Sequence, residues 1–236
     1  MGIDGFMEMH DRRFVIITGL WPEEAGYSAF PETAPGDFVA CADSGYTVCA
    51  FAGIHPDIVI GDFDSLTAAE ISGIEAAGIE RVVHPCEKDD TDTMLCAKYG
   101  LAHGYERFLI AGGIGGGFGH TMANLQTLSF LTDMECEAMI VTDRERLFMA
   151  DGETVSARRE ARPAGPAVFS GRPGAKFSVL SYAERSSGVY IENARYGLSD
   201  AVLTQSYPVG VGNEFVNASP VTVSVRHGRL LIIAER

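Results

Sequence analysis

Short apolar runs alternate with helix-like segments up to about residue 145, and this alternation constrains the fold more than any other feature. Two of the segments between these runs, residues 92–104 and 120–131, carry apolar residues at helical spacing, for example Met94, Ala97 and Leu101. Strands that are apolar throughout and alternate with helices predict a parallel sheet covered on both faces. The predicted strands span residues 13–19, 37–43, 57–62, 81–85, 107–113 and 137–143.

After about residue 145 strand-like runs follow one another, and His227-Gly228 between two of them predicts a hairpin turn. The expected fold class is therefore α/β, with two domains. Residues 1–148 are predicted to form a three-layer α/β/α, Rossmann-like domain with a mostly parallel sheet. Residues 149–236 are predicted to form an all-β sandwich domain.

The overall charge narrows the class of partner. A net charge of −14 disfavours binding to nucleic acid or to a membrane surface, whereas a small anion held by backbone amides or a metal ion remains compatible. Five cysteines without a CxxC motif are typical of buried residues in a reducing compartment. With no signal-peptide pattern and no apolar run of ~20 residues, we expect a cytoplasmic protein.

Acidic residues follow three of the predicted strands. Ligands bind beyond the carboxyl ends of strands in open parallel sheets, so these side chains are predicted to converge. A carboxylate cluster without histidine suits Mg²⁺. The alternative is a set of turn formers and helix caps, with Asp90 or Thr91 as the N-cap of a helix over residues 92–103. The cluster comprises Asp43, Asp62, Asp64, Asp89, Asp90 and Asp92.

The sequence GDFDSL, residues 61–66, holds two of these carboxylates. In an extended chain Asp62 and Asp64 point to one face, and Phe63 is predicted to point into the core. Lys88 lies near the other aspartates in sequence, where it could neutralise them or bind phosphate.

A glycine-rich loop follows the predicted strand that ends near residue 111. Residues 112–119 contain six glycines, and a helix is expected to begin near His120 or Thr121. Glycines at a helix N-terminus let backbone amides approach a polyphosphate, although the loop matches neither the G-x-G-x-x-G nor the G-K-S/T fingerprint. The other interpretation is a mobile surface loop.

Together these motifs resemble the thiamine pyrophosphokinase (thiamine diphosphokinase) family. The matching segments are CADSGY, GIHPDIVIGDFDSL, KDDTDTMLCA and AGGIGGGFGHTMANL, and the resemblance continues into the β-rich half. It implies that ATP and thiamine give thiamine diphosphate and AMP, with Mg²⁺ as cofactor. It also implies a homodimer, with thiamine bound where the α/β domain of one subunit meets the β domain of the other.

The resemblance also implies roles for individual residues. Asp64 and Asp92 are expected to be catalytic, and the metal would be held by Asp62, Asp64, Asp89 and Asp92. The expected ATP contacts are Asp43, Ser44, Lys88, Gly112, Gly113 and His120. The expected thiamine contacts are Asn124, Tyr196 and Asn213.

The chain departs from the family pattern at three positions. Where the family loop reads G-G-R-x-D-H, Gly117 replaces the arginine and Gly119 replaces the aspartate, and Gly212 replaces a serine. Losing the arginine removes a planar cation that could pair with phosphate. A second hypothesis is therefore a nucleotide-binding or sensing protein on the same scaffold, with catalysis lost or redirected to another alcohol.

Overall fold

The computed structural model describes residues 12–21, 30, 33–152 and 165–236. The described residues up to Asp143 form one compact unit, and those from Arg144 onward form another. In the described part of the chain, no helix combines the length and the apolar character needed to cross a membrane.

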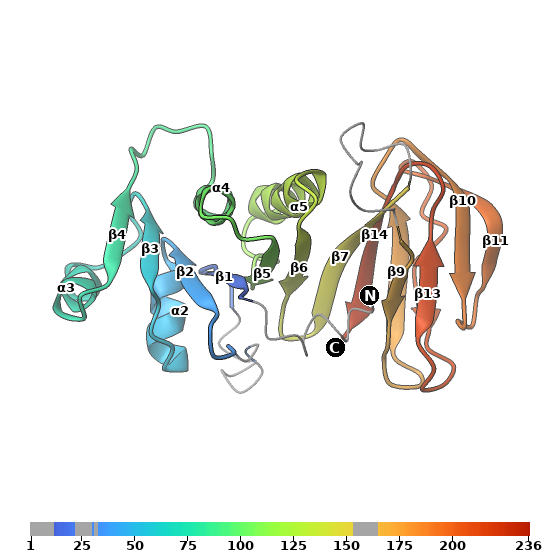
Figure 1. Ribbon diagram of the computed structural model, residues 1–236, viewed down its shortest axis with the longest axis horizontal. Coiled ribbons are helices and arrows are strands. Elements are labelled where there is room, and N and C mark those ends of the chain that lie inside the picture. The colour runs from blue at the N-terminus through green and yellow to red at the C-terminus, as the bar shows by residue number, and fades with distance from the viewer. Residues whose placement is uncertain (1–11, 22–29, 31–32, 153–164) are drawn as a thin grey trace. The chain divides into compact units, whose positions relative to one another are not determined.

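The first unit contains a six-stranded parallel sheet with the order β6-β5-β1-β2-β3-β4. These strands follow one another in the blue-to-green part of Figure 1. The α/β class and the parallel sheet are thus confirmed. The elements are β1 Phe14–Ile17, β2 Phe38–Ala42, α2 Gly45–Ala52, β3 Ile58–Gly61, α3 Ala68–Ala76, β4 Glu80–Val83, α4 Asp92–Ala102, β5 Arg107–Ala111, α5 Phe118–Asp133 and β6 Glu137–Val141.

Helices cover both faces of this sheet. Phe14 and Phe38 are paired in register, and the ring of Phe38 lies 6.3 Å from that of Tyr99 in α4. Cys41 is three positions along β2 from Phe38 and therefore points to the opposite face. There its Sγ lies 3.0 Å from the Sγ of Cys49 in α2. Accordingly α2 and α4 pack on opposite faces, as the apolar character of the strands predicts.

Helix α4 begins at a capped position beside the acidic cluster. Thr91 has an extended conformation, and its side chain accepts a hydrogen bond from the backbone N–H of Met94. This is the geometry of an N-cap, which satisfies one of the free donors of the first turn. Of the two N-cap candidates, Thr91 is therefore the correct one, and Asp92 is the first helical residue.

The second unit consists of antiparallel strands in two groups, with the orders β12-β9-β14-β7 and β11-β10-β13-β8. Most of them occupy the orange-to-red part of Figure 1. The strands are β7 Glu145–Asp151, β8 Ala167–Phe169, β9 Lys176–Ser181, β10 Arg185–Glu192, β11 Leu198–Thr204, β12 Asn213–Glu214, β13 Val221–Ser224 and β14 Arg229–Glu235.

An aromatic cluster joins the two groups of strands. The ring of Phe169 in β8 lies 5.3 Å from Phe148 in β7 and 5.4 Å from Phe177 in β9, both edge-on. Phe215 completes the cluster at 5.7 Å from Phe169. Edge-on aromatic pairs gain about 0.5–1.5 kcal/mol beyond their buried area, so this cluster is a main source of stability for the unit.

The predicted hairpin at His227-Gly228 is wrong. β13 pairs with β10 and β8, whereas β14 pairs with β7 and β9. Residues 225–228 therefore pass from one sheet to the other. The sequence pattern was misleading because a crossing between packed sheets and a hairpin both place a glycine between two alternating runs.

Replacing Gly100 in α4 by alanine should destabilise the protein. An added Cβ would lie 2.6 Å from Phe108 Cε1 and 2.9 Å from Phe14 Cγ. Alanine normally stabilises a helix by up to about 1 kcal/mol relative to glycine, but overpacking here should cost about 1–3 kcal/mol. Urea unfolding should show this loss for Gly100→Ala.

Gly73→Ala in α3 is the matched control. Its new Cβ would approach only the Tyr46 hydroxyl, at 3.1 Å, which can move aside. Equal stabilisation of both variants would contradict the tight packing of α4 on the sheet.

Candidate functional site

The carboxyl ends of β1, β2 and β3 are in direct contact. Gly19 follows β1, and a Cβ on it would lie 2.0 Å from the Oγ of Ser44, which follows β2. A Cβ on Gly61, at the end of β3, would lie 2.8 Å from the Cβ of Asp43. Glycine at both positions lets the strand ends approach closely, and this brings Ser44 and Asp43 to one edge.

Asp43 ties the end of β2 to the turn after β3. It is 5% exposed and adopts a left-handed backbone conformation with φ of 43°, which aspartate tolerates better than most residues. Its Oδ1 accepts a hydrogen bond of 3.0 Å from the backbone N–H of Phe63. The carboxylate thus orients the GDFDSL turn.

The prediction that Phe63 anchors this turn in the core is wrong. Phe63 is half-buried, has φ of 64°, and carries the Arg81 guanidinium 5.9 Å from its ring centroid. The chain is therefore not extended at this residue. Asp62 and Asp64 still converge, because the left-handed turn brings the Asp64 backbone N–H to 3.4 Å from Asp62 Oδ1.

Lys88 holds two of the predicted metal ligands together. Its Nζ lies 2.7 Å from Asp62 Oδ2 and 3.0 Å from Asp92 Oδ1. The hydrogen bond from Lys88 lowers the pKa of Asp62. Burial lowers the pKa of Lys88, but its contacts with the two carboxylates outweigh this and raise the pKa above its ordinary value.

Asp92 occupies a different electrostatic environment from Asp62. Burial raises its pKa, as do the charges of Asp43 and Asp62, whereas Lys88 opposes the rise. Its Oδ1 is buried and lies 3.0 Å from the Lys88 Nζ. A buried carboxylate oxygen with remaining acceptor capacity fits a cation ligand.

The geometry beside Asp62 also fits a metal ion. Ligand atoms of Asp62, Asp64 and Cys86 all lie within 4.8 Å of one another. The carboxylate oxygens are the hard ligands that Mg²⁺ prefers. Cys86 escaped the sequence analysis, although its place two residues before Lys88 in the same loop was a usable signal.

The other two acidic residues of the predicted cluster, Asp89 and Asp90, have surroundings that differ from those of Asp62 and Asp92. Asp89 is exposed, and Asp90 forms an ion pair of 2.6 Å with Lys98 of α4. The structure therefore connects Asp43, Asp62, Asp64 and Asp92 through direct or shared contacts. The metal role of Asp89 stays a prediction.

The glycine loop between β5 and α5 is held at defined points. Four of its glycines have positive φ, which favours glycine over other residues: Gly112, Gly113, Gly115 and Gly116. A Cβ on Gly112 would lie 2.6 Å from Thr18 Oγ1 at the end of β1. Helix α5 begins at Phe118, slightly earlier than expected, and His120 is exposed in its first turn.

Asn124 lies beneath this loop. It is 4% exposed, and its Nδ2 donates a hydrogen bond of 2.8 Å to the Gly113 carbonyl. Thr121 hydrogen-bonds Gly115. These contacts fix the loop backbone at Gly113 and Gly115. The loop therefore has one defined conformation, and its positive φ angles are the reason for its glycines.

In the antiparallel unit, Asn213 holds Tyr196. Asn213 is 5% exposed, and its Oδ1 accepts the Tyr196 backbone N–H at 3.0 Å while its Nδ2 donates to the Tyr196 carbonyl at 2.8 Å. The Tyr196 ring is 61% exposed, with Arg195 5.8 Å from its centroid. Arg195 is itself paired with Glu214. The buried amide thus fixes the backbone of Tyr196, whose ring is exposed.

The three departures from the family pattern have different structural settings. Gly212 has φ of 75°, a left-handed conformation that favours glycine over serine. Gly117 is the N-cap of α5, with an ordinary φ of −77°. A Cβ on Gly117 would approach only His120 Cδ2, at 3.4 Å, and one on Gly119 would meet no atom of the described structure within 4 Å. Both loop positions can therefore accept larger side chains.

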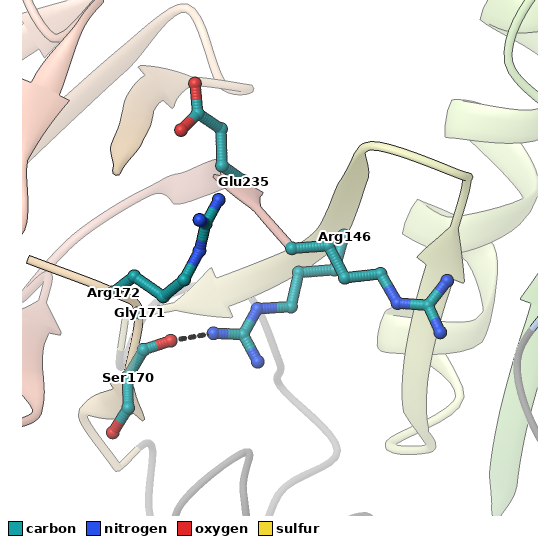
Figure 2. A pocket seen from close by; sticks show the side chains of 6 residues that line it. Arg146, Ser170, Gly171, Arg172 and Glu235 are labelled. Carbon is teal, nitrogen blue, oxygen red and sulfur yellow. Dashed lines mark hydrogen bonds between the residues drawn. The ribbon is translucent and has the colours of Figure 1, made fainter. Parts of the chain in front are cut away.

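A separate cavity of about 360 Å³ lies in the antiparallel unit. Figure 2 shows Arg146 from β7 donating a hydrogen bond to the Ser170 carbonyl, with Arg172 and Glu235 nearby. Gly171 and Arg236 complete the lining. None of the predicted site residues lines this cavity.

Carboxylates and a glycine loop at the carboxyl edge of a parallel sheet have the features of α/β domains that hold a phosphorylated ligand with a divalent cation. Comparison with known proteins narrows this class. Residues 33–140 match the family model described as thiamin pyrophosphokinase, catalytic domain. The resemblance to thiamine pyrophosphokinases that the motifs indicate is therefore confirmed.

Individual relatives agree with this match. The thiamine pyrophosphokinase of Bacillus subtilis (strain 168) is 26% identical over 192 residues, covering 81% of this chain and 84% of the relative. The crystal structure of thiamine pyrophosphokinase from Bacillus subtilis has a TM-score of 0.79 at 23% identity, covering 95% of this chain and 99% of that one. Thiamin pyrophosphokinase from Candida albicans has a TM-score of 0.76 at 13% identity, covering 100% and 92%. These structural matches show a shared fold.

Lys88→Met should destabilise the metal-free protein most near neutral pH. The pKa of Asp62 is depressed in the folded state, so its ion pair stabilises the protein above the ordinary aspartate pKa of 3.8 and is lost on acidification. We expect a loss of about 1–2 kcal/mol at neutrality that shrinks as the pH falls. Urea unfolding with a chelator present, at several pH values, measures this.

Lys98→Met removes the exposed pair with Asp90 and serves as the control. Its cost should be no more than about 1 kcal/mol. A pH-independent loss for Lys88→Met would contradict the electrostatic role of Lys88.

Proposed function

We propose that this protein transfers the diphosphate group of ATP to the hydroxyl of thiamine, giving thiamine diphosphate and AMP with Mg²⁺ as cofactor. The observation that carries the proposal is that Asp62 and Asp92 both contact Lys88, with Asp43 close enough to raise the pKa of Asp92, within the segment that matches the catalytic domain. Diphosphate transfer depends on positioning and charge neutralisation, which this edge supplies.

The α/β domain, residues 1–148 in our assignment, would bind ATP. Mg²⁺, held by Asp62, Asp64, Asp89 and Asp92, would neutralise charge on the phosphate oxygens. Ser44 and the amides of Gly112 and Gly113 would orient the phosphates from neighbouring strand ends. His120 in the first turn of α5 and Lys88 would add contacts from either side of the nucleotide.

A carboxylate is proposed to accept the proton of the attacking hydroxyl. Asp64 and Asp92 are the candidates, and the geometry favours Asp92. Its burial raises the pKa above that of an exposed aspartate, which makes it the stronger base. Asp64 is exposed and better placed to bind a cation.

The β domain, residues 149–236 in our assignment, would bind thiamine. The exposed face of Tyr196 would attract a flat aromatic cation, and Asn213 holds the Tyr196 backbone in place. The family resemblance places Asn124 near thiamine as well; its contact with Gly113 suits an indirect role through the loop. A cytoplasmic homodimer with thiamine at the subunit interface, and no nucleic-acid partner, is part of the proposal.

The alternative is a nucleotide sensor, or an enzyme acting on another alcohol. The glycines at 117 and 119 motivate it, since they remove an arginine and an aspartate from the family loop. The set of carboxylates and its lysine favour the diphosphokinase, because nucleotide binding alone does not require a half-buried carboxylate that can act as a base.

A product assay with Asp62→Ala and Asp92→Ala tests the reaction. Purified protein, Mg²⁺, ATP and thiamine should yield AMP and thiamine diphosphate, separated by chromatography, and both variants should lose at least about a hundredfold in turnover. Asp90→Asn is the matched control, since Asp90 pairs with Lys98 outside the cluster. ATP binding without products would favour the sensor; near-normal AMP release from both alanine variants would overturn the site assignment.

Restoring the family arginine with Gly117→Arg should strengthen ATP binding. The backbone at 117 accepts a side chain, and a charge-assisted hydrogen bond to phosphate is worth about 1.5–3 kcal/mol when well formed. We expect the ATP KM to fall about tenfold. Gly117→Gln is the control, because it adds a side chain of similar length at the same position without the positive charge. An equal effect of both changes would contradict phosphate contact.

A further inference from the structure

We propose that Arg195 is a positioning residue for the substrate at Tyr196: held by Glu214, it restrains the Tyr196 ring in the orientation that receives a flat cationic ring. This inference rests on the proposed function, in which Tyr196 contacts thiamine. It extends that function to the groups that prepare the ring for binding.

The Tyr196 ring is not held by the contacts that fix its backbone. Asn213 binds the backbone N–H and carbonyl of Tyr196, and neither hydrogen bond involves the ring. Tyr196 is 61% exposed, so packing restrains its side-chain torsions little. Ordering a flexible side chain on binding costs free energy, so a ring that is already restrained binds its ligand more tightly.

Arg195 supplies a contact with the ring itself. The central carbon of its guanidinium lies 5.8 Å from the ring centroid, within the ~6 Å reach of a cation–π interaction. Tyr207 offers a comparison, because it is 68% exposed in the same antiparallel unit. Among the residues that the structure describes, no such cation lies at the Tyr207 ring. The cation at Tyr196 is therefore not a general feature of exposed tyrosines in this unit.

Glu214 holds Arg195 beside the ring. The Arg195 Nη1 donates to both Glu214 carboxylate oxygens, at 3.2 and 3.3 Å, and the Arg195 backbone N–H donates to the Glu214 carbonyl at 3.0 Å. Exposed ion pairs are usually weak because both side chains must be ordered to form them. Here the backbone hydrogen bond already brings the two residues together, which reduces that cost.

Glu214 is in turn anchored to the sheet. It pairs with Lys176 across β12 and β9, and the Lys176 Nζ lies 2.5 Å from Glu214 Oε2. The Glu214 backbone N–H donates to Asn213 Oδ1 at 2.8 Å. The hydrogen bond from Lys176 is the main cause that lowers the pKa of Glu214, and this favours the charged carboxylate that Arg195 binds. A continuous set of contacts thus links the sheet to the Tyr196 ring.

The pairing with Glu214 also suits a cationic substrate. A guanidinium beside the ring would by itself repel a second cation, whereas the carboxylate bound to it offsets that charge. Arg195 can therefore restrain the ring without excluding a positively charged ligand.

Thiamine kinetics of Arg195→Met, Glu214→Gln and the double variant test the inference. Each single variant should raise the thiamine KM about three- to tenfold, the range expected when one side chain must be ordered on binding. The ATP KM and kcat should stay near the wild-type values. The double variant should be no worse than the more impaired single variant, because both changes remove one contact. Arg195→Lys keeps a cation and should recover most of the loss.

Arg226→Met is the matched control, since it removes an exposed arginine of the same unit whose ion pair is with Asp200. Its thiamine KM should equal that of the wild type. An unchanged thiamine KM in Arg195→Met, or an equal rise in Arg226→Met, would overturn the proposal. A lower KM in Arg195→Met would also overturn it, because Arg195 would then compete with the substrate for the ring.

Nuclear magnetic resonance of protein with ¹³C-labelled tyrosine rings gives a readout that does not depend on catalysis. The Tyr196 ring signals, identified by their absence in Tyr196→Phe, should shift in Arg195→Met and Glu214→Gln and stay in place in Arg226→Met. Unchanged signals in the first two variants would refute the contact.

The inference and the proposed function fail separately. Thiamine should shift the Tyr196 signals of the wild type, and should do so at lower concentration than in Arg195→Met. That result without AMP formation would refute the diphosphokinase and retain the role of Arg195. Product formation with an unchanged thiamine KM in Arg195→Met would refute the role of Arg195 and retain the diphosphokinase.

Discussion

Mutual repulsion of carboxylates at the carboxyl edge of the parallel sheet is the constraint on which the site depends. The chain carries a net charge of −14, and the fold places Asp43, Asp62 and Asp92 near one another. Lys88 offsets this repulsion by binding two of them at 2.7 and 3.0 Å. A backbone N–H from Phe63 satisfies the third. In the proposed function, this same cluster of negative charge would bind the cation.

Buried amide side chains fix the two parts of the protein that are expected to meet substrates. Asn124 holds the glycine loop through Gly113, and Asn213 holds Tyr196 through both its backbone groups. In each case an amide that is almost fully buried sets the position of a more exposed element. Buried hydrogen bonds of this kind are costly to break, so they preserve geometry where side chains alone would move.

The sequence predicted the parallel sheet well because apolar runs of strand length have few alternatives when helical segments separate them. It also placed Asp43 and Asp62 correctly, each directly after a strand, because apolar runs mark where a buried strand ends. It failed at Phe63, where a left-handed turn replaces the expected extended chain. It failed again at residues 225–228, where strand pairing depends on which sheet each strand joins.

By itself the sequence determined the α/β class, an N-cap at residue 90 or 91, the acidic motifs and their family resemblance, because these depend on local pattern and spacing. Only the tertiary structure decided which charges meet. Lys88 is separated from Asp62 by 26 residues, and Cys86 reaches the same carboxylates from the loop after β4. Such contacts depend on the conformation of the loops at the edge of the sheet. The number of residues between two side chains in the sequence does not determine that conformation. The environment that raises the pKa of Asp92 arises in the same way, from burial and neighbours that only folding supplies.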